Sequence, residues 1–400
     1  MGINNNPLKI AFVSEWGNIN DPKNRSGLPY FLSENMKKHN IQVIPVIADN
    51  FHRSWTNKAI SRLKIISYNK VLQGKLGFYN PERSKEFLET YSKVVKEKLV
   101  GLDYDIIFCP GTLPVAYLDK IEKPLVIWVD ATFASLYNYY PEFSSFHKSS
   151  IEDGNQAEKL AFSKASLLLF SSEWAASSAI NDYNSSKDKV KVIPFGANLE
   201  SEKSSIEIET IIENRDKNIC KLLFFGAGWK RKGGEIVYQV CQELVKHKFK
   251  FELHIVGVPK SQFINNESWL FSYGYLDKSS EIDLNKINHL FKNCHFLFMP
   301  TRYEAFGHVY AEASSFGLPS LATNTGGVSS VVRDEVNGKL FNYNTPIEEY
   351  AKYIITTFDN KELYDNLCMN SFLEYKRRLN WDINIKLFLE YLNPLVQVKS

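Results

Sequence analysis

Short apolar runs alternate with longer segments of helical periodicity along most of the chain. Several runs end in glycine, proline, aspartate or serine and are followed by a helical pattern. Continuous apolar strands that alternate with helices predict parallel sheets covered by helices on both faces. The runs include "LKIAFVSE", "IQVIPVIA", "DIIFCPG", "PLVIWVD" and "SLLLFSS" in the first half, and "KLLFFGAG", "FELHIVGV", "CHFLFMPT" and "PSLAT" in the second.

A polar stretch interrupts this strand rhythm near the middle of the chain. Since 400 residues exceed one typical core, we place a linker there, over residues 199–218. We expect an N-terminal domain over residues 1–198 and a C-terminal domain over 219–375. The segment 376–400 holds the amphipathic run "WDINIKLFLEYL" and is expected to pack back toward the N-terminal domain. The predicted fold class is α/β, with two doubly wound units facing across a cleft and ligands outside the strand C-termini.

Composition and charge narrow the class of protein. A net charge of +3 is too small to indicate a nucleic-acid binder. The five cysteines show no metal-ligand spacing, and their odd number is typical of a reducing compartment. No apolar run is long enough to span a membrane, and no signal peptide is recognisable. We therefore expect a cytoplasmic protein, with attachment to the inner face of the membrane as an open alternative.

One basic segment is the reason for considering attachment to the membrane. Residues 53–75, "RSWTNKAISRLKIISYNKVLQGK", hold six Lys or Arg and no acidic residue, interleaved with apolar side chains. A basic amphipathic surface of this kind suits an anionic membrane or an anionic acceptor. A helix that packs one face on its domain and solvates its lysines would show the same pattern.

The stretch from residue 301 to 328, "TRYEAFGHVYAEASSFGLPSLATNTGGV", places two glutamates in a sequence that otherwise reads as core. We predict that Glu304 ends a strand and that a helix begins near Gly307, so that its first amides can receive an anion. Glu312 then lies about a turn and a half inside the helix and leans back toward its start. Phosphate would suit the amides, and sugar hydroxyls would suit the carboxylates.

A second glycine turn follows the next strand. Gly326 and Gly327 stand between "PSLAT" and the expected helix start "VSSVV", where backbone amides could approach a phosphate or a sugar. A solvated loop glutamate and a surface helix glutamate would be the plain alternative for either carboxylate. Two successive anion-binding turns favour a functional site, and they also argue against a glycosidase acid pair.

A basic turn follows the first strand of the second half. "FFGAGWKRKGG" brings Arg231 and Lys232 to that strand end, where a guanidinium and an ammonium suit a diphosphate. A solvated helix start would give the same residues without a function.

Together these motifs resemble the retaining family-4 glycosyltransferases of the GT-B fold. The resemblance rests on Glu304 and Glu312 with seven residues between them, on Phe306–Gly307, on "GLP" and on Gly326–Gly327. It extends through "VVRDEVNGKLF", "IVGV", "SYGYLDK" and "VIPFGAN", and so covers most of the chain. Ala227 departs from the pattern, since many members have Arg there, and Arg231 is the expected replacement.

The resemblance implies that the domain over residues 1–198 binds the acceptor and that the domain over 219–375 binds the nucleotide-sugar, both with Rossmann-like folds. It also implies roles for individual residues. Glu304, Lys232 and Arg231 would be catalytic, with Glu304 on donor-sugar hydroxyls and the two cations on the leaving diphosphate. Glu312 would hold the nucleotide ribose. The donor-binding residues implied by the resemblance are Glu312, Phe306, Gly307, His308, Gly326, Gly327, Gly27, Gly274, Tyr275 and Leu276.

The first domain contributes two further candidates. Gly27 lies in the glycine loop "SEWGNINDPKNRSGLPYFL", which in the family closes over the diphosphate and the acceptor, and which could also be an ordinary loop. Asp130 ends "VIWVD", where it could bind an acceptor or donor hydroxyl or cap the next turn. The Asp103–Tyr104–Asp105 triplet precedes a strand, at the wrong end of a parallel sheet for a ligand, so we expect no metal and no cofactor.

The implied activity is a metal-independent, retaining transfer of a hexose from a UDP- or GDP-sugar to a glycan or glycolipid hydroxyl, in bacterial cell-surface polysaccharide or glycolipid synthesis. A leaving-phosphate oxygen would be the base, because no side chain is an obvious one. Another GT-B enzyme, such as a nucleotide-sugar epimerase or phosphorylase, and a non-catalytic GT-B partner subunit are the alternatives.

Overall fold

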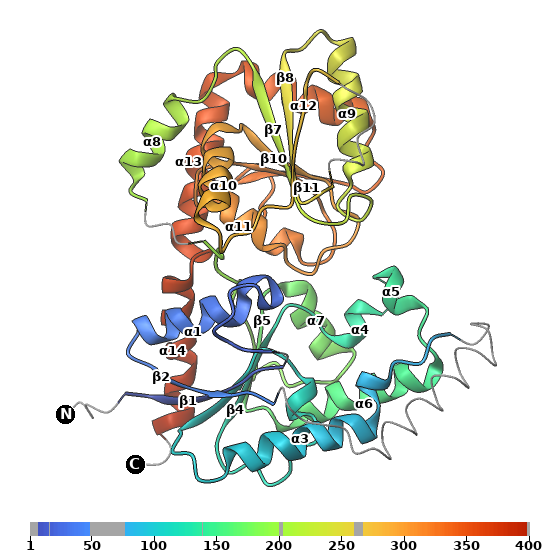
Figure 1. Cartoon of the computed structure of the whole chain (residues 1–400), viewed down its shortest axis with the longest axis vertical. Helices are drawn as coiled ribbons and strands as arrows, with labels where there is room; N and C mark the ends of the chain where they lie inside the picture. Colours follow the sequence, from blue (N-terminus) through green and yellow to red (C-terminus); the bar gives the residue numbers. More distant parts are fainter. Residues whose placement is uncertain are drawn as a thin grey trace. The chain divides into compact units, whose positions relative to one another are not determined.

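The chain forms two compact units (Figure 1). Unit 1 comprises Met1–Ile193 and Ile385–Ser400, and unit 2 comprises Pro194–Asn384. The computed structural model describes residues 7–15, 17–48, 77–137, 139–199, 203–259 and 267–397, so the basic segment 53–75 lies outside the described residues. The expectation of two doubly wound α/β units is confirmed in each half.

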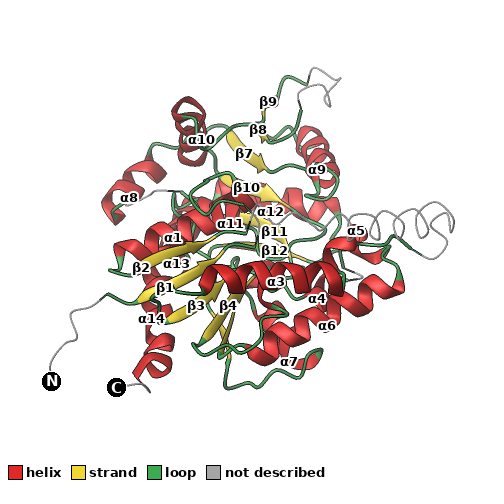
Figure 2. Cartoon of the chain, turned by 60° about the horizontal axis from the view of Figure 1, so that its bottom comes forward, coloured by secondary structure: helices red, strands yellow, loops and turns green. Residues whose placement is uncertain are grey.

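Unit 1 is built on a six-stranded sheet in the order β2-β1-β3-β4-β5-β6, and every neighbouring pair is parallel. The strands read as continuous apolar runs because helices cover both faces; all four residues of β3 and all five of β4 are buried (Figure 2). The strands are β1 (Lys9–Val13), β2 (Gln42–Val46), β3 (Ile106–Cys109), β4 (Leu125–Val129), β5 (Leu167–Phe170) and β6 (Val190–Val192).

The helices of unit 1 begin where the sequence provides caps. Ser84 accepts a hydrogen bond from the Phe87 amide to start one helix, and Ser172 accepts one from the Ala175 amide to start another. The helices are α1 (Leu28–Lys38), α3 (Lys85–Leu99), α4 (Phe133–Leu136), α5 (Pro141–Ser144), α6 (Lys148–Lys164) and α7 (Glu173–Asn181).

Unit 2 repeats the design with a second parallel sheet, in the order β12-β11-β10-β7-β8-β9. Its central strands β7 and β10 pair in the register Phe296 opposite Leu222 and Leu297 opposite Leu223. The strands are β7 (Cys220–Phe225), β8 (Phe251–Val256), β9 (Leu270–Gly274), β10 (Phe296–Met299), β11 (Ser320–Thr323) and β12 (Gly338–Phe341).

Helices flank this sheet on both sides (Figures 1 and 2). α9 packs against α12, whereas α10 and α13 both pack against α8. The helices are α8 (Ser205–Glu213), α9 (Gly234–Lys246), α10 (Glu281–Asn293), α11 (His308–Ser314), α12 (Ile347–Asp359), α13 (Lys361–Arg378) and α14 (Trp381–Gln397).

The segment 199–218 differs from the linker that the sequence predicted. Residues 205–213 form α8 within unit 2, because Ser204 and Glu207 make a reciprocal capping box and Ile208 and Ile212 are buried. The charge of this stretch belongs to the exposed face of an amphipathic helix. The boundary between the units falls instead at Ile193 and Pro194.

The C-terminal helix α14 begins in unit 2 and continues into unit 1. Its first residue, Trp381, donates from Nε1 to Asn198 Oδ1 at 3.1 Å within unit 2. Further along, the Phe388 ring stacks on Trp128 at 5.7 Å and meets Phe108 edge-on at 5.6 Å. Residues 385–400 therefore belong to unit 1.

Each sheet has one point where the strand order reverses. In unit 1 the reversal lies between β1 and β3, and in unit 2 it lies between β7 and β10. Loops that leave neighbouring strands in opposite directions open a crevice at the C-terminal strand ends, where open α/β sheets bind ligands. The positions that follow β7 and β10 are therefore the place to look for a site.

Candidate functional site

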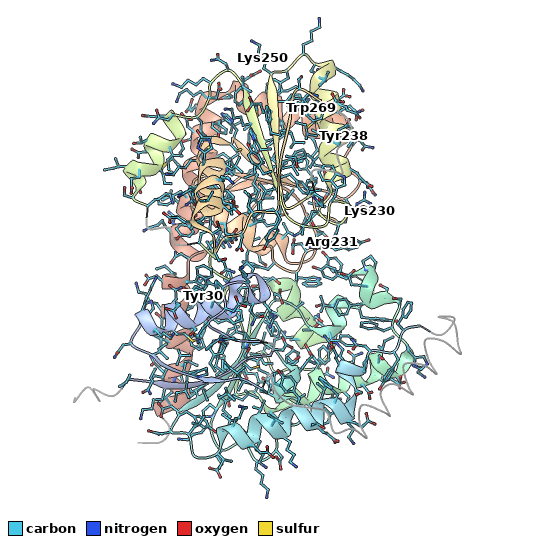
Figure 3. The ribbon with its side chains drawn as sticks, viewed as in Figure 1. Tyr30, Lys230, Arg231, Tyr238, Lys250 and Trp269 are labelled. Carbon is cyan, nitrogen blue, oxygen red and sulfur yellow. The ribbon has the colours of Figure 1, made fainter. Side chains whose placement is uncertain are left out.

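The basic turn and the glutamate turn predicted from the sequence follow the two strands at this reversal point. The turn that holds Arg231 and Lys232 follows β7, and the turn that holds Glu304 follows β10. Figure 3 shows Arg231 and Lys250 at opposite ends of unit 2, as expected for residues that follow one strand and precede another. The basic turn lies at the C-terminal end of the sheet.

Lys232 and Glu304 form a buried ion pair across the reversal point. The Lys232 Nζ contacts Glu304 Oε2, and the two residues are 9% and 8% exposed. Arg231 Nη1 lies 4.0 Å from the same oxygen and donates to the Tyr303 carbonyl at 3.2 Å. Two cations therefore share one carboxylate, which leaves the turn with net positive charge suited to an anion.

The backbone of the two turns is tightly joined. Gly233 has φ +79°, and a Cβ there would lie 2.0 Å from the Pro300 carbonyl oxygen. The Arg302 amide donates to the Arg231 carbonyl at 2.8 Å, and the Thr301 hydroxyl donates to the same carbonyl at 3.3 Å. Only glycine permits this close approach, which fixes the position of the lysine relative to the glutamate.

Glu312 lies on α11 and is 1% exposed. Its Oε1 forms an ion pair with Lys278 Nζ. Its Oε2 is buried and has no hydrogen-bond partner among the described residues. Because a buried carboxylate oxygen without a donor is costly, this atom is an acceptor ready for a ligand hydroxyl.

The start of α11 confirms the helix boundary expected from the sequence. Gly307 is the N-cap with φ +86°, a left-handed conformation that favours glycine. The Phe306 ring is buried and meets Phe195 edge-on at 5.4 Å, and the His308 ring stacks on Phe195 at 5.3 Å. The aromatic contacts hold the turn in place, so its backbone is positioned by packing.

The second glycine turn lies beside the first. The Gly327 amide donates to the Glu304 carbonyl at 3.1 Å, and Gly326 has φ +52°. In place of the expected helix start, residues 328–330 form a single 3-10 turn. The turn does not continue as a helix: the Val331 and Val332 amides both donate to the Val328 carbonyl, and the Arg333 amide donates instead to Asn337 Oδ1 at 2.6 Å.

A family model matches this part of the chain. Residues 205–372 match the model described as "Glycosyl transferases group 1". We refer to residues 205–372 as the group 1 domain. The basic turn, the glutamate turn, the second glycine turn, Lys278 and Glu312 all lie within this match.

Curated relatives match less than half of the chain. An uncharacterized 41.2 kDa protein in the cps region of Klebsiella pneumoniae is 27% identical over 187 residues, 46% of this chain and 48% of that protein. An uncharacterized glycosyltransferase of Methanocaldococcus jannaschii is 26% identical over 161 residues, 40% of this chain and 44% of that protein. The aligned parts thus span about half the length of these relatives.

Solved structures extend the likeness to both units. HepE from Anabaena, in structures with UDP and with UDP-glucose, aligns with TM-scores of 0.62 and 0.60 at 17% and 18% identity. Each alignment covers 97% of this chain and 100% of HepE. The chain has the GT-B fold, as the sequence predicted.

Within the group 1 domain, the end of β9 supplies the last donor-binding candidates. Gly274 closes the strand with φ +73°, and its carbonyl accepts from the Gly257 amide at 2.7 Å. Tyr275 is 76% exposed, whereas Leu276 is buried. An exposed aromatic ring beside two glycine turns offers a stacking surface at the same end of the sheet.

Lys278 is a residue of the group 1 domain that sequence analysis did not single out. It lies 34 residues before its partner Glu312, so no local spacing reveals the pair. The only signal was chemical: a glutamate in an apolar helix needs a cation, and several lysines could have supplied it.

Unit 1 places its two candidates at the C-terminal end of its own sheet. Gly27 is the N-cap of α1 with φ +85°, and a Cβ there would lie 3.1 Å from the Pro22 carbonyl oxygen. Asp130 directly follows β4 and is partly buried. Both residues belong to unit 1, whereas the group 1 domain belongs to unit 2.

A buried carboxylate lies close to the C-terminal strand ends of unit 1. Glu158 on α6 accepts from the Thr112 hydroxyl at 2.7 Å and from the Phe133 amide at 3.2 Å. Burial raises the pKa of Glu158 to about 7, although the nearby Arg83 guanidinium opposes the shift. These contacts tie α6 to the residues that follow β3 and β4.

Glu158→Gln should therefore change how stability depends on pH. Because the folded state holds the Glu158 proton more tightly than the unfolded chain does, the parent should lose stability as pH rises from the ordinary value of 4.5 to about 7. The loss should reach about 3 kcal/mol, at about 1.4 kcal/mol per pKa unit. Urea denaturation at pH 5 and pH 8 measures it, and the variant should lack this loss.

The control for that experiment is Glu97→Gln on the exposed face of α3. It should follow the parent at both pH values. A Glu158→Gln variant that loses as much stability as the parent between pH 5 and pH 8 would contradict the assignment.

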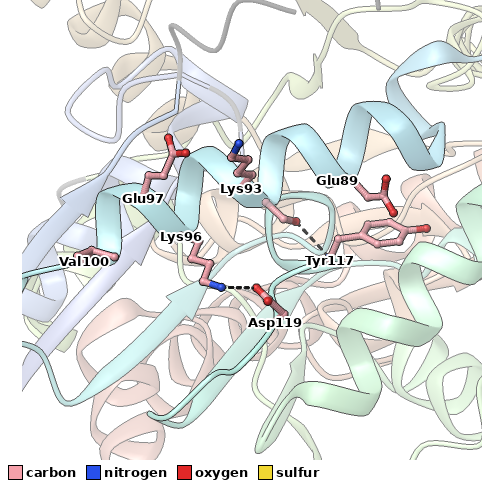
Figure 4. Close-up of a pocket in the computed structure, with 8 residues that line it drawn as sticks. Glu89, Lys93, Lys96, Glu97, Val100, Tyr117 and Asp119 are labelled. Atoms are coloured by element: carbon pink, nitrogen blue, oxygen red, sulfur yellow. Dashed lines mark hydrogen bonds and ion pairs between the residues drawn. The ribbon is translucent and has the colours of Figure 1, made fainter. Parts of the chain in front are cut away.

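A surface pocket of about 500 Å³ lies elsewhere in unit 1 (Figure 4). It is lined by α3 and by residues that precede β4, including the Lys96–Asp119 ion pair at 2.6 Å. This is the N-terminal end of β4, opposite to the end at which such sheets bind ligands. The pocket is therefore separate from the candidate residues of unit 1.

Among the described residues, no group of three or more His, Cys, Asp or Glu side chains could hold a metal ion. Asp103 pairs with Lys9, and Asp105 accepts from the Lys9 amide at 2.9 Å, both beside the start of β3.

No helix in the described ranges combines the length and apolar character needed to cross a bilayer. All five cysteines are free and buried.

Proposed function

We propose that this chain is a retaining family-4 glycosyltransferase that moves a hexose from a UDP- or GDP-sugar to a hydroxyl group of a glycan or glycolipid. The observation that carries the proposal is the buried Lys232–Glu304 ion pair at the strand reversal of the group 1 domain. The structures of HepE with UDP and UDP-glucose support a nucleotide-sugar donor. The relative from the cps region of Klebsiella pneumoniae supports a role in bacterial cell-surface polysaccharide synthesis.

The proposed reaction breaks the bond between the sugar C1 and the oxygen of the diphosphate. The acceptor oxygen forms the new bond to C1 on the face from which the diphosphate leaves, and its proton passes to an oxygen of the departing phosphate. Lys232, Arg231 and the amides of residues 306–308 would stabilise the negative charge that develops on the leaving group.

The carboxylates would hold the donor. Glu304 would accept from hydroxyls of the transferred sugar while Lys232 keeps its charge in place. Glu312 would accept from ribose hydroxyls through Oε2, its oxygen without a described partner. Gly274, Tyr275 and Leu276 would contact the base, and Gly326 and Gly327 would approach the sugar or the diphosphate.

A thermal-shift panel of UDP-, GDP- and ADP-glucose tests the donor class. A ligand that binds only the native state raises its stability by about 2.7 kcal/mol at 100 times its dissociation constant. We expect UDP- or GDP-glucose to raise the melting temperature. If none of the three shifts it, the proposed donor class is wrong.

Product analysis with the stabilising donor then separates the alternatives. A transferase forms a new glycoside, an epimerase changes only the donor sugar, a phosphorylase needs inorganic phosphate, and a non-catalytic subunit forms no product. The anomeric proton coupling of the product, measured by NMR, tests retention. An inverted linkage would contradict the retaining assignment.

Transfer should survive exhaustive EDTA treatment. Lys232, Arg231 and backbone amides would supply the positive charge that a divalent cation provides elsewhere. Turnover before and after chelation is the measurement. Loss of activity with EDTA and recovery with Mg²⁺ or Mn²⁺ would show that the reaction needs a metal.

We further propose a cytoplasmic enzyme that contacts anionic membrane through residues 53–75, and we expect those residues to give salt-sensitive binding to anionic vesicles. Each Lys or Arg near such a surface contributes about 1 kcal/mol. Co-sedimentation with anionic and neutral vesicles at low and high salt measures it, with Arg62, Lys64 and Lys70 changed to Gln as the comparison. A parent that ignores anionic vesicles at low salt would leave 53–75 as a solvated segment and favour a soluble acceptor.

A further inference from the structure

One face of α13 is polar and buried, a feature that sequence analysis did not single out. Ser371, Glu374 and Arg378 are three and four residues apart, so they lie on the same side of the helix. Ser371 and Glu374 are 0% and 4% exposed, and the Arg378 side chain is 15% exposed. Polar side chains at this depth need partners, and most of these partners lie outside α13.

Arg378 contacts the segment that follows the second glycine turn. Its Nη1 donates to the Ser330 carbonyl at 2.5 Å, and its Nη2 donates to the Val331 carbonyl at 3.2 Å. The Ser330 amide donates to the Gly327 carbonyl at 3.0 Å, and the Gly327 amide donates to the Glu304 carbonyl at 3.1 Å. Three hydrogen bonds in series therefore lead from Arg378 to the backbone of Glu304.

Glu374 fixes the direction of this guanidinium. Its Oε2 forms an ion pair with Arg378 Nε and lies 3.2 Å from Arg333 Nη1. Arg333 belongs to the same segment as the two carbonyl groups that Arg378 contacts. One buried carboxylate thus joins α13 to residues 330–333 both directly and through Arg378.

Ser371 joins the same face of the helix to α11. Its Oγ lies 3.2 Å from Ser314 Oγ, and α13 packs against α11. Ser314 is two residues after Glu312 on α11. α13 therefore contacts both the helix that holds Glu312 and the segment that follows Gly326 and Gly327.

Stability is a weak explanation for the Glu374–Arg378 pair. Replacement of a buried ion pair by apolar residues of similar volume is often neutral or stabilising. An apolar side chain cannot supply a planar fork of donors, which holds two carbonyl groups in one fixed geometry. The pair thus sets the position of the backbone at Ser330 and Val331 rather than adding to its burial.

We propose that Arg378 is a positioning residue for the transfer reaction. It holds the second glycine turn, and through it the backbone of Glu304, at the place that donor binding requires. Arg378 is not itself catalytic, because it acts on the donor only through Ser330 and Gly327. This role rests on the proposed function, since it requires that the nucleotide-sugar binds at the second glycine turn.

Isothermal titration calorimetry of the full chain with UDP-glucose and GDP-glucose measures this role without an acceptor. For each donor that binds the parent, Arg378→Met should raise the Kd about tenfold, because the turn loses two hydrogen bonds from a charged donor. The binding stoichiometry should stay unchanged, since every folded molecule has the same loosened turn. Arg378→Lys should give an intermediate Kd, because an ammonium keeps the charge but not the fork.

A purely structural role would change the stoichiometry instead. Loss of stability alone lowers the fraction of folded chains and leaves the Kd of the remaining ones at the parent value. Arg377→Met is the matched control, because it removes the same charge from the next residue of α13, which is exposed. It should change neither the Kd nor the stoichiometry. If Arg378→Met does not fold, Arg378→Lys serves for the comparison.

The outcomes separate this role from the proposed function. Arg378 variants that bind the donor with the parent Kd, at full or reduced stoichiometry, would overturn the positioning role and leave the donor proposal standing. An equal rise in Kd for Arg377→Met would also overturn it, since the effect would then follow net charge rather than the hydrogen bonds. A parent that binds neither UDP-glucose nor GDP-glucose would overturn the proposed donor, and the positioning role with it.

Discussion

Glu304→Gln should reduce turnover about 100-fold or more while the protein remains folded. Hydrogen bonds to a charged acceptor are worth about 1.5–3 kcal/mol, and about 1.4 kcal/mol corresponds to a tenfold change in rate. The substitution also leaves the buried ammonium of Lys232 without its counter-ion. Steady-state turnover with the stabilising donor, together with the melting temperature, is the measurement.

Glu235→Gln supplies a matched control for this experiment. Glu235 pairs with Arg302 at 2.8 Å. This ion pair also joins the start of α9 to the turn after β10, but it is more exposed to solvent than the Lys232–Glu304 pair. This control should retain nearly all turnover. Near-normal turnover in Glu304→Gln would remove Glu304 from the donor site.

A double substitution tests whether Lys232 and Glu304 act together. Lys232→Met alone should cost about 100- to 1,000-fold, the range found when a donor to a developing negative charge is removed. If the pair is one functional unit, Glu304→Gln should add little to Lys232→Met. Multiplicative losses would indicate two independent roles.

Arg215→Met should destabilise unit 2 by about 3–5 kcal/mol, because several buried acceptors lose a charged donor at the same time. Arg215 is 3% exposed and donates from Nη1 and Nη2 to the carbonyls of Gly317 and Phe316, both at 3.0 Å. It also donates to the Lys292 carbonyl at 3.1 Å and to the Tyr364 hydroxyl at 2.9 Å. Removal of the guanidinium leaves these buried acceptors unsatisfied.

Urea denaturation followed by circular dichroism measures the loss. Arg377→Met, on the exposed face of α13, is the control and should change stability by less than about 0.5 kcal/mol. Arg215→Lys should fall between the parent and Arg215→Met, because an ammonium keeps the charge but not the planar fork of donors. A loss below about 1 kcal/mol for Arg215→Met would show that the network contributes little.

The fold was largely predictable from sequence because its strands are buried on both faces. Runs such as "PLVIWVD" have no polar alternation, and this pattern indicates a covered parallel strand. The linker predicted over residues 199–218 was wrong, because the many charged residues of this segment also suit the exposed face of a helix. The cap at Ser204 and Glu207 and the spacing of Ile208 and Ile212 were the signals for α8.

The site was predictable where one motif lies on one turn. The start of α11 at Gly307 follows from the sequence, because glycine, an apolar helix and a preceding strand occur together. The pairing of Lys232 with Glu304 does not, since it depends on β7 lying beside β10. Nothing local distinguishes Lys232 from Lys230, which is exposed.

Contacts between turns on different strands show the same limit. Arg25 lies in the glycine loop that follows β1, and its Nη1 donates to the Pro110 carbonyl at 2.7 Å. Pro110 follows β3, which lies beside β1 in the sheet but far from it in the sequence. The order of the strands in the sheet therefore decides which of these residues meet.

The central position of β7 has a consequence for synthesis of the chain. β10 pairs with β7, and the Lys232–Glu304 contact closes a separation of 72 residues. At roughly 5–20 residues per second, a ribosome needs about 4–14 s to add that length. During this interval one edge of β7 has no partner strand, and Lys232 has no counter-ion from Glu304. Nascent chains stalled before β10 should therefore be prone to edge-to-edge association, and a chaperone that covers β7 would protect them.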